Sequence, residues 1–169
     1  LYSVSVDGGR YEQVLATPAE EVSFIGNDGA FVYQDCKGGE NIWRKHHTSS
    51  VTRDIWMYDG SKHVKLTSFE GEDRSPRVSA DGKTVYFMSE RDGSFNVYSF
   101  PVDDPQNVTR VTRHKTHPVR FLTLSDNDDI CYGYDGDIYV KKAGAAARKL
   151  QVTVKSDKND DNLAEISVS

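Results

Sequence analysis

The sequence predicts an all-β protein made of four-stranded antiparallel blades, a partial β-propeller of about three and a half blades. Apolar and polar residues alternate in short runs, and turns that contain Asp or Asn with Gly separate these runs. A pair of apolar and aromatic residues also marks one type of strand. The pairs begin at Ile55, Val97 and Ile138, at intervals of 42 and 41 residues, within the roughly 40 to 50 residues of a propeller blade. Another pair begins at Leu1, and the longer interval after it contains an insertion.

The stretch 78–98, VSADGKTVYFMSERDGSFNVY, shows the pattern of one unit. Residues 84–90 alternate between the two faces of a strand, are rich in β-formers, and lie between Asp81-Gly82 and Asp92-Gly93. Glycine adopts a positive φ without steric cost, and the aspartate carboxylate accepts a nearby backbone N–H, so each Asp-Gly pair suits a tight turn. The run 95–100 is then the next strand.

Each unit is expected to contain an inner strand, a turn, a strong second strand, a third strand with the aromatic pair, and a fourth strand. Aligned on the pairs, the units have the bounds 1–15, 16–67, 68–112 and 113–154. The first would supply only the outer strands of a preceding blade, at 1–6 and 11–15. The strands expected in the full units are 22–25, 31–35, 54–58 and 64–67; 76–80, 84–90, 95–100 and 108–112; 119–125, 129–134, 137–141 and 148–152.

Two segments fall outside this repeat. Residues 36–53 form a long insertion between the second and third strands of the unit 16–67. Residues 155–169 begin with a run rich in Asp, Lys and Asn that lacks periodicity. This composition favours a linker to a following domain.

Charge and composition exclude several classes of protein. The 169 residues contain 21 Lys and Arg against 26 Asp and Glu, a net charge of -5, and the basic residues are scattered, so we expect no nucleic-acid partner. No apolar run approaches about 18 residues, so we expect no membrane span. Cys36 and Cys131 have no partner at metal-ligand spacing, which favours buried free thiols, and no cofactor is expected.

The number of predicted blades indicates a larger assembly. Propellers typically contain about four to eight blades, more than this sequence supplies. Blades bury their faces against their neighbours, so terminal blades alone would leave apolar surface exposed. The chain also begins without Met. We therefore expect a fragment or processed product that associates with further blades, with homo-oligomerisation as an alternative.

One face of the predicted blades collects the candidate functional residues. The loop between strands two and three of a blade opens on the same face as the loop from strand four to the next blade. The insertion 36–53 belongs to the first class, and 70–75 and 113–118 belong to the second. The candidate residues on this face are Arg44, Lys45, His46, His47, Glu72, Asp73, Arg74, His114, Lys115 and His117.

Two chemical interpretations of this face are not favoured. Four of the five histidines suggest a metal site, but none shows the i, i+4 helical spacing of a zinc hydrolase. Ser49 or Ser50 with His46 or His47 could form a nucleophile and base, but a triad also needs an orienting carboxylate and an oxyanion hole. No catalytic residue and no metal ligand is therefore predicted.

Two further interpretations are equally favoured and compatible with each other. The face could guide peptides, or its ion pairs could pin the polar insertion to the next blade, because polar loops need such partners. If the insertion is pinned, we expect Asp73 or Arg74 to contact residues 36–53, through an Arg–carboxylate or Arg–carbonyl bond.

Several motifs also indicate a family. Ser79-Ala80-Asp81-Gly82 resembles the PD40 repeat of TolB-like propellers, where the turn is usually Ser-Pro-Asp-Gly. Residues 41–56 (NIWRKHHTSSVTRDIW), 66–74 (LTSFEGEDR) and 114–121 (HKTHPVRF) together resemble the N-terminal six-bladed propeller of the tricorn protease family. The resemblance covers roughly residues 1–152.

This resemblance implies a non-catalytic propeller segment that acts in substrate gating, peptide channelling or assembly. The serine peptidase core and PDZ domain of the family lie far C-terminal of the propeller, and no motif of that core occurs here, so no peptidase activity is expected of the chain. The implied partners are the remaining blades, the downstream peptidase domains and peptides, and the implied compartment is the cytoplasm. The alternative is a free-standing TolB-like propeller, a protein-binding module in the periplasm. The insertion 36–53 and the stretch 114–121 favour the first reading.

Overall fold

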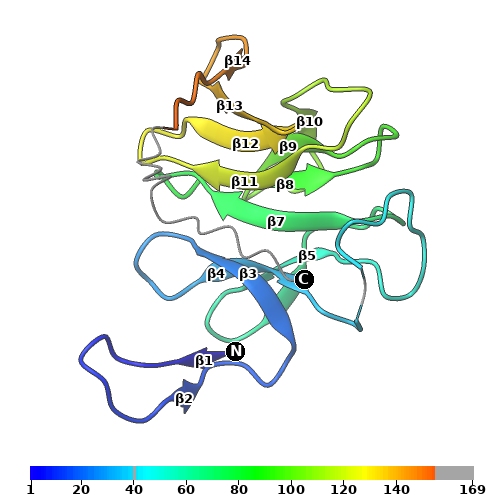
Figure 1. Cartoon of the computed structure of the whole chain (residues 1–169). Helices are drawn as coiled ribbons and strands as arrows, with labels where there is room; N and C mark the ends of the chain where they lie inside the picture. The colour runs from blue at the N-terminus through cyan, green and yellow to red at the C-terminus, as the bar shows by residue number, and fades with distance from the viewer. Residues whose placement is uncertain (40, 155–169) are drawn as a thin grey trace, which may run out of the picture.

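The computed structural model describes residues 1–39 and 41–154, which form 14 β-strands and no helix (Figure 1). Three sheets have four strands each, in the orders β3-β4-β5-β6, β7-β8-β9-β10 and β11-β12-β13-β14, and β1 pairs with β2. The strands are β1 Tyr2–Ser3, β2 Glu12–Gln13, β3 Ala19–Phe24, β4 Phe31–Asp35, β5 Ile55–Tyr58, β6 His63–Lys65, β7 Asp73–Val78, β8 Thr84–Ser89, β9 Asn96–Pro101, β10 Thr109–Arg110, β11 Arg120–Leu124, β12 Ile130–Tyr134, β13 Asp137–Lys141 and β14 Arg148–Lys149. The expected linker at 155–169 lies outside the described residues.

Each four-stranded sheet follows the order of the chain, and its neighbouring strands are antiparallel. The ladder between β8 and β9 runs without a break from the pair Thr84 and Pro101 to the pair Ser89 and Asn96. The first strands of the three sheets lie side by side, because β7 contacts both β3 and β11 (Figure 1). These sheets are the blades of a partial β-propeller, which confirms the fold class predicted from the repeat.

The bounds of the inner and outer strands differ from the prediction. β7 begins at Asp73 rather than at residue 76, because Asp73 and Arg74 already pair with β8. The fourth strand β10 is shorter than the predicted 108–112. The backbone N–H groups of Val111 and Thr112 both donate to the carbonyl oxygen of Val97, so the regular ladder ends there.

The three inner strands share one irregularity, a β-bulge at the same place in each strand. The register shifts fall between Glu20 and Ser23, between Arg74 and Arg77, and between Arg120 and Thr123. In each bulge one residue other than glycine has a left-handed backbone: Glu21 with φ 53°, Ser75 with φ 52° and Phe121 with φ 58°. Bulges redirect side chains and are frequent beside functional sites. These positions therefore indicate the inner wall as a candidate functional site.

The core lies between the sheets rather than within one of them. One apolar cluster joins the first and second four-stranded sheets, and its buried residues are Val32, Ile55, Leu66, Val85, Phe87, Tyr98 and Phe100. A second cluster joins the second and third sheets, and its buried residues are Met88, Phe95, Val97, Val119, Leu122, Ile130 and Tyr132. Each blade therefore buries apolar surface against the next blade.

Two smaller sequence predictions concern the membrane and the thiols. None of the elements in residues 1–39 and 41–154 is a helix with the length and apolarity needed to cross a bilayer. Cys36 and Cys131 are free, as predicted, but both are half-buried rather than buried. Cys36 comes directly after β4, where the chain leaves the sheet and solvent reaches the thiol.

Candidate functional site

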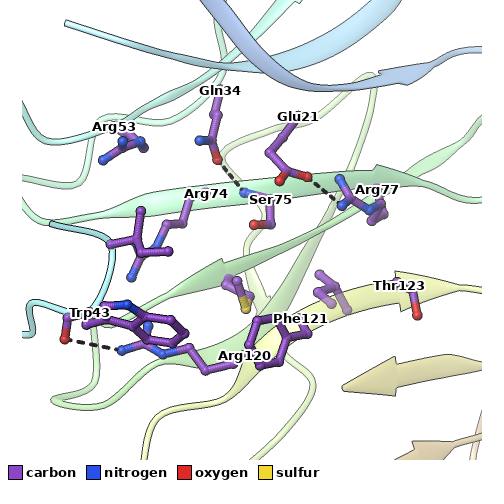
Figure 2. A pocket seen from close by; sticks show the side chains of 13 residues that line it. Glu21, Gln34, Trp43, Arg53, Arg74, Ser75, Arg77, Arg120, Phe121 and Thr123 are labelled. Atoms are coloured by element: carbon purple, nitrogen blue, oxygen red, sulfur yellow. Dashed lines mark hydrogen bonds and ion pairs between the residues drawn. The ribbon is translucent and has the colours of Figure 1, made fainter. Parts of the chain in front are cut away.

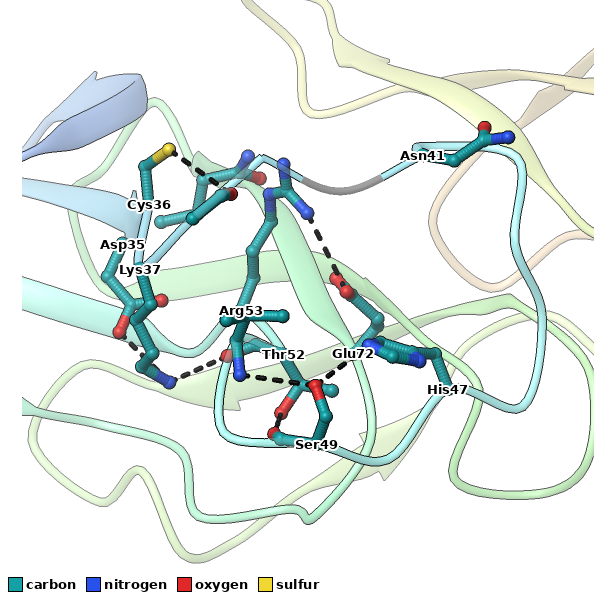
Figure 3. A network of polar contacts seen from close by, with 12 residues as sticks. Asp35, Cys36, Lys37, Asn41, His47, Ser49, Thr52, Arg53 and Glu72 are labelled. Carbon is teal, nitrogen blue, oxygen red and sulfur yellow. Dashed lines mark hydrogen bonds and ion pairs between the residues drawn. The ribbon is translucent and has the colours of Figure 1, made fainter.

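The two ends of the insertion 36–53 are held together beside the first four-stranded sheet. The Nζ atom of Lys37 donates to the carbonyl oxygen of Thr52 at 2.6 Å and to Oδ2 of Asp54 at 2.5 Å. It also lies 3.2 Å from Oδ2 of Asp35. Figure 3 shows Lys37 between Asp35 and Thr52. This ammonium group fixes the base of the loop because it bridges the two neighbouring carboxylates and satisfies a carbonyl group, while Lys65 also pairs with Asp54 at 2.9 Å.

The second blade holds the middle of the insertion. Glu90, at the end of β8, accepts the backbone N–H of His46 at 2.6 Å and the backbone N–H of His47 at 3.2 Å. His46 has a left-handed backbone with φ 54°, so its two flanking peptide groups turn sharply at this point. The buried Glu90 carboxylate therefore acts as a clamp on the loop.

The insertion also reaches the third blade. The guanidinium of Arg120, on β11, lies 5.5 Å from the ring centre of Trp43, and its Nη2 atom donates to the Trp43 carbonyl oxygen at 3.5 Å. The Trp43 ring meets the Phe121 ring edge to face, with centroids 6.2 Å apart. A loop that leaves the first full blade thus contacts both of the following blades.

The predicted segment Glu72 to Arg74 meets the insertion through the Glu72 side chain and the Asp73 backbone. Glu72 faces Arg53, with Oε1 3.6 Å from Nη1 (Figure 3), and the backbone N–H of Asp73 donates to the Arg53 carbonyl oxygen at 3.0 Å. The carboxylate of Asp73 instead binds Arg91. The guanidinium of Arg74 stacks over the Phe95 ring at 4.3 Å. The pinning bonds come from Glu90, from Glu72 and from the backbone of Asp73. The predicted contact of Asp73 or Arg74 with the insertion is therefore made by Asp73, through its backbone N–H and an Arg53 carbonyl oxygen rather than through an arginine side chain.

His114 and His117 lie on the loop before β11, in contact with an aromatic cluster of the third blade. The His114 ring stacks on Tyr134 with centroids 3.7 Å apart, and its Nε2 atom lies 2.9 Å from the hydroxyl oxygen of Tyr132. His117 lies nearer solvent, with Nε2 3.4 Å from Oδ1 of Asp135. Both therefore have packing partners within their own blade.

The environment of His114 predicts a pH dependence of stability. Burial, with a smaller contribution from Arg110, lowers the pKa of His114 below 6.5. The unfolded chain then binds a proton more readily than the folded chain, so this contribution to stability is complete above about pH 6.5 and is lost as the pH falls. We expect the melting temperature to fall less steeply below pH 6.5 in His114→Gln than in the unchanged chain. An identical change of slope in His117→Gln, which alters the more exposed ring, would contradict the assignment to His114.

The hydroxyl group of Ser49 lies next to a histidine, as the disfavoured nucleophile hypothesis requires. Its Oγ atom is 2.8 Å from Nε2 of His47. The same Oγ accepts the backbone N–H of Val51 at 3.2 Å, and the hydroxyl group of Thr52 donates to the Ser49 carbonyl oxygen at 2.9 Å. These bonds describe a local turn inside the insertion, and a turn of this kind explains the position of the hydroxyl group without catalysis.

The remaining predicted residues are placed as follows. Arg44 and Lys45 are exposed on the insertion, as is Lys115 on the loop before β11. In the part of the chain that the structure describes, no three His, Cys, Asp or Glu side chains lie close enough to hold a metal ion.

A pocket of about 370 Å³ opens between the inner strands and the insertion (Figure 2). Its aromatic and aliphatic walls come from the insertion, from β8 and from β11: Ile42, Trp43, Met88, Phe121 and Leu122. Its polar and charged residues are Glu21, Gln34, Arg53, Arg74, Ser75, Arg77, Arg120 and Thr123. All three bulged strands contribute to this pocket, so it belongs to the inner wall of the propeller.

Sequence reasoning missed most of this pocket. Only Arg74 among the predicted candidates lines it. Trp43 and Phe121 are 56% and 69% exposed, unusual for large aromatic side chains, and both lie in stretches that the sequence comparison had already singled out. An unexplained aromatic residue in a polar loop was therefore the available signal.

Comparison with known proteins supports the fold. Neither the protein-family models nor the curated proteins give a match. Among solved structures, the tricorn protease superposes with a TM-score of 0.76 at 22% identity over 93% of this chain, and the putative TolB from Agrobacterium tumefaciens with 0.70 at 20% identity over 88%. TolB from Acinetobacter baumannii gives 0.60 at 19% identity over 85%.

The chain spans only part of each of these structures. It covers 15% of the tricorn protease chain, 55% of the Agrobacterium TolB chain and 34% of the Acinetobacter TolB chain. At these identities the likeness establishes a shared propeller fold. The tricorn-like and TolB-like propeller suspected from the motifs is therefore confirmed at the level of the fold.

Proposed function

We propose that this chain is a non-catalytic propeller segment whose inner wall binds peptides and guides them toward a peptidase elsewhere in the parent protein. The observation that carries the proposal is the pocket between the bulged inner strands. Five apolar or aromatic side chains form part of its walls, and eight polar or charged residues converge on it. Apolar contact area together with orienting polar groups suits a small ligand or a peptide side chain.

The geometry of Trp43 and Phe121 supports a peptide as the ligand. Both rings are more than half exposed, yet they are held in place, because each contacts the other and Trp43 also contacts Arg120. Rigid exposed aromatic side chains provide contact area at a low cost in conformational entropy. The remaining blades and the downstream peptidase domains are the proposed partners, with the cytoplasm as the compartment.

The alternative function is a free-standing module that binds a folded protein, as expected for a TolB-like propeller. The two TolB structures share the fold with this chain. The compartment proposed for this alternative is the periplasm. The size of the pocket favours the peptide proposal, because it accommodates a side chain rather than the broad surface of a folded partner.

Titration with peptides tests the proposed function. The full chain should bind tryptophan-free peptides of mixed sequence saturably, and its tryptophan fluorescence should change because Trp43 lies in the pocket. Trp43→Ala and Phe121→Ala should each weaken binding by roughly tenfold or more, as is typical of aromatic hot-spot residues. Isothermal titration calorimetry provides the affinity for Trp43→Ala, which loses the fluorescent group.

The matched control is Phe24→Ala. Phe24 is also an exposed aromatic residue of an inner strand, 64% exposed, but it does not line the pocket. This variant should bind peptides as the unchanged chain does. Binding that is equal in all three variants would place the ligand outside the pocket and overturn the proposal.

A further inference from the structure

Two neighbouring blades place an arginine at the same position of the bulged inner strand. Arg74 pairs with Met88 across the ladder just before the bulge of β7, and Arg120 pairs with Gly133 just before the bulge of β11. Both guanidinium groups lie over the Phe95 ring, with the ring centre 4.3 Å from Cζ of Arg74 and 5.0 Å from Cζ of Arg120. Figure 2 shows both side chains extending from their strands toward Trp43. The two blades therefore direct two cations into one pocket.

Arg74 is buried and Arg120 is half-buried, and both guanidinium groups are short of hydrogen-bond partners. Arg74 is only 6% exposed, and among the described residues its Nε and Nη2 atoms have no acceptor. The Nη1 atom of Arg120 is also buried and has no acceptor among the described residues. A buried donor without an acceptor is costly, and the cost is larger for a charged group. Such a guanidinium group is suited to receive an acceptor from a ligand.

Most of the carboxylate oxygens near these arginines are engaged by other groups, although Oε2 of Glu72 has no hydrogen-bond partner among the described residues. Both oxygens of Glu90 accept backbone N–H groups from the insertion. Glu20 and Glu72 lie at 3.5 and 3.6 Å from Arg53, another of the four arginines that line the pocket. Glu21 forms its ion pair with Arg77. Arg74 and Arg120 are thus left without a carboxylate in direct contact among the described residues.

The charge state of Arg74 is compatible with anion binding. Burial is the main cause that lowers its pKa to about 10; the charges of Glu72 and Glu90 oppose this decrease, and the neighbouring Arg120 and Arg53 add to it. The group still carries its proton at neutral pH. An added negative charge in the pocket would offset the energetic cost of burying the cation and would reduce the repulsion between the arginines.

We propose that the Arg74 and Arg120 side chains form a specificity subsite for an acidic side chain, Asp or Glu, of the bound peptide. The planar fork of a guanidinium group matches the two oxygens of a carboxylate. Trp43, Phe121 and Leu122 supply the apolar walls for the aliphatic part of that side chain. This inference rests on the proposed function and adds the class of peptide that the pocket prefers.

Two peptides test the inference, and they differ only in a side-chain carboxylate that is replaced by an amide. Both have acetylated and amidated ends and no other charge, and one carries Glu where the other carries Gln. Isothermal titration calorimetry on the full chain should give an affinity about 10- to 100-fold higher for the Glu peptide, the range expected for hydrogen bonds to a charged group. Arg74→Gln and Arg120→Gln should each reduce this preference strongly.

The controls separate the subsite from general effects of charge and folding. Arg10→Gln removes an exposed arginine of the β1–β2 loop and should keep the preference for Glu. Circular dichroism verifies that each variant is folded. Arg74→Lys, which keeps the charge but not the fork, should retain part of the preference, so it tests the subsite even if Arg74→Gln does not fold.

Each outcome of the titration has a definite meaning. Equal binding of the Glu and Gln peptides overturns the acidic subsite and leaves the proposed peptide function in place. A preference for Glu that is undiminished in Arg74→Lys, in Arg120→Gln and, where it folds, in Arg74→Gln places the recognition elsewhere and also overturns the inference. Binding of neither peptide, together with failure of the mixed peptides, overturns the proposed function itself.

Discussion

Replacing Arg91 with methionine should lower the free energy of unfolding by about 3 to 5 kcal/mol, the range for breaking a buried ion pair by removing one partner. Asp73 is 0% exposed, and Nη2 of Arg91 lies 3.1 and 3.0 Å from its two carboxylate oxygens. The guanidinium group also lies 5.2 Å from the ring centres of both Phe87 and Tyr98. Methionine preserves much of the packing against these rings, so the loss reports mainly on the unpaired carboxylate. Urea unfolding at pH 7 measures it.

The pH dependence of this variant provides a second check. Burial raises the pKa of Asp73, and the charge of Arg91 is the largest influence that opposes the increase. Without Arg91, the folded chain should take up a proton on Asp73 at a higher pH than the unfolded chain does. The loss of stability in Arg91→Met should therefore be greater at pH 7 than at pH 5.

Two further variants isolate the ion pair. Lys83→Met makes a comparable change at an exposed position of the same blade and should alter stability by less than about 0.5 kcal/mol. The double variant Asp73→Asn with Arg91→Met should be more stable than Arg91→Met alone, because it no longer buries an unpaired charge. Equal stability of the single and double variants would show that the pair is not the cause.

Replacing Glu90 with alanine should release the middle of the insertion 36–53. The variant leaves the backbone N–H groups of His46 and His47 without their acceptor, and we expect a loss of about 1.5 to 3 kcal/mol, the range for hydrogen bonds to a charged group. The exposed Arg44 and Lys45 lie directly before the clamp and are sites for trypsin. Cleavage at these two positions should become faster, because local opening exposes the backbone to the protease.

Glu70→Ala is the matched control for the clamp. Glu70 is exposed on the same face, and its carbonyl oxygen rather than its side chain contacts the insertion, at 3.3 Å from Oγ1 of Thr52. Its removal should leave both the melting temperature and the rate of cleavage unchanged. An unaltered rate in Glu90→Ala would mean that other contacts are sufficient to hold the loop.

The fold was largely predictable because the sequence patterns that specify it lie close together along the chain. Period-two alternation, Asp-Gly turns and the recurring aromatic pair all lie within one blade, and the second strand of the first full unit was predicted with its observed bounds, Phe31–Asp35. The start of β7 was missed because the bulge after Arg74 interrupts the alternation. A pattern with a period of two cannot be followed through an inserted residue.

The candidate site was predictable only in part because its contacts are distant in the sequence. The face shared by 36–53 and 70–75 follows from the order of the strands. The role of Glu90 as the clamp does not follow from that order. It depends on where the middle of a loop of 18 residues comes to lie on the next blade. The pairing of Arg74 with Phe95 likewise depends on the bulge that turns its side chain.

The reach of the insertion has a consequence for the cooperativity of unfolding. An array in which each repeat touches only its neighbours behaves as a one-dimensional chain, and a repeat at one end can melt by itself. Here residues 36–53 connect the first full blade to Glu90 in the second and to Arg120 in the third. The middle blade is thereby fastened from both sides, and the couplings extend to the second-nearest neighbour. We therefore expect the three blades to unfold as a single thermodynamic unit, with the inner wall that they share keeping its shape until all of them open.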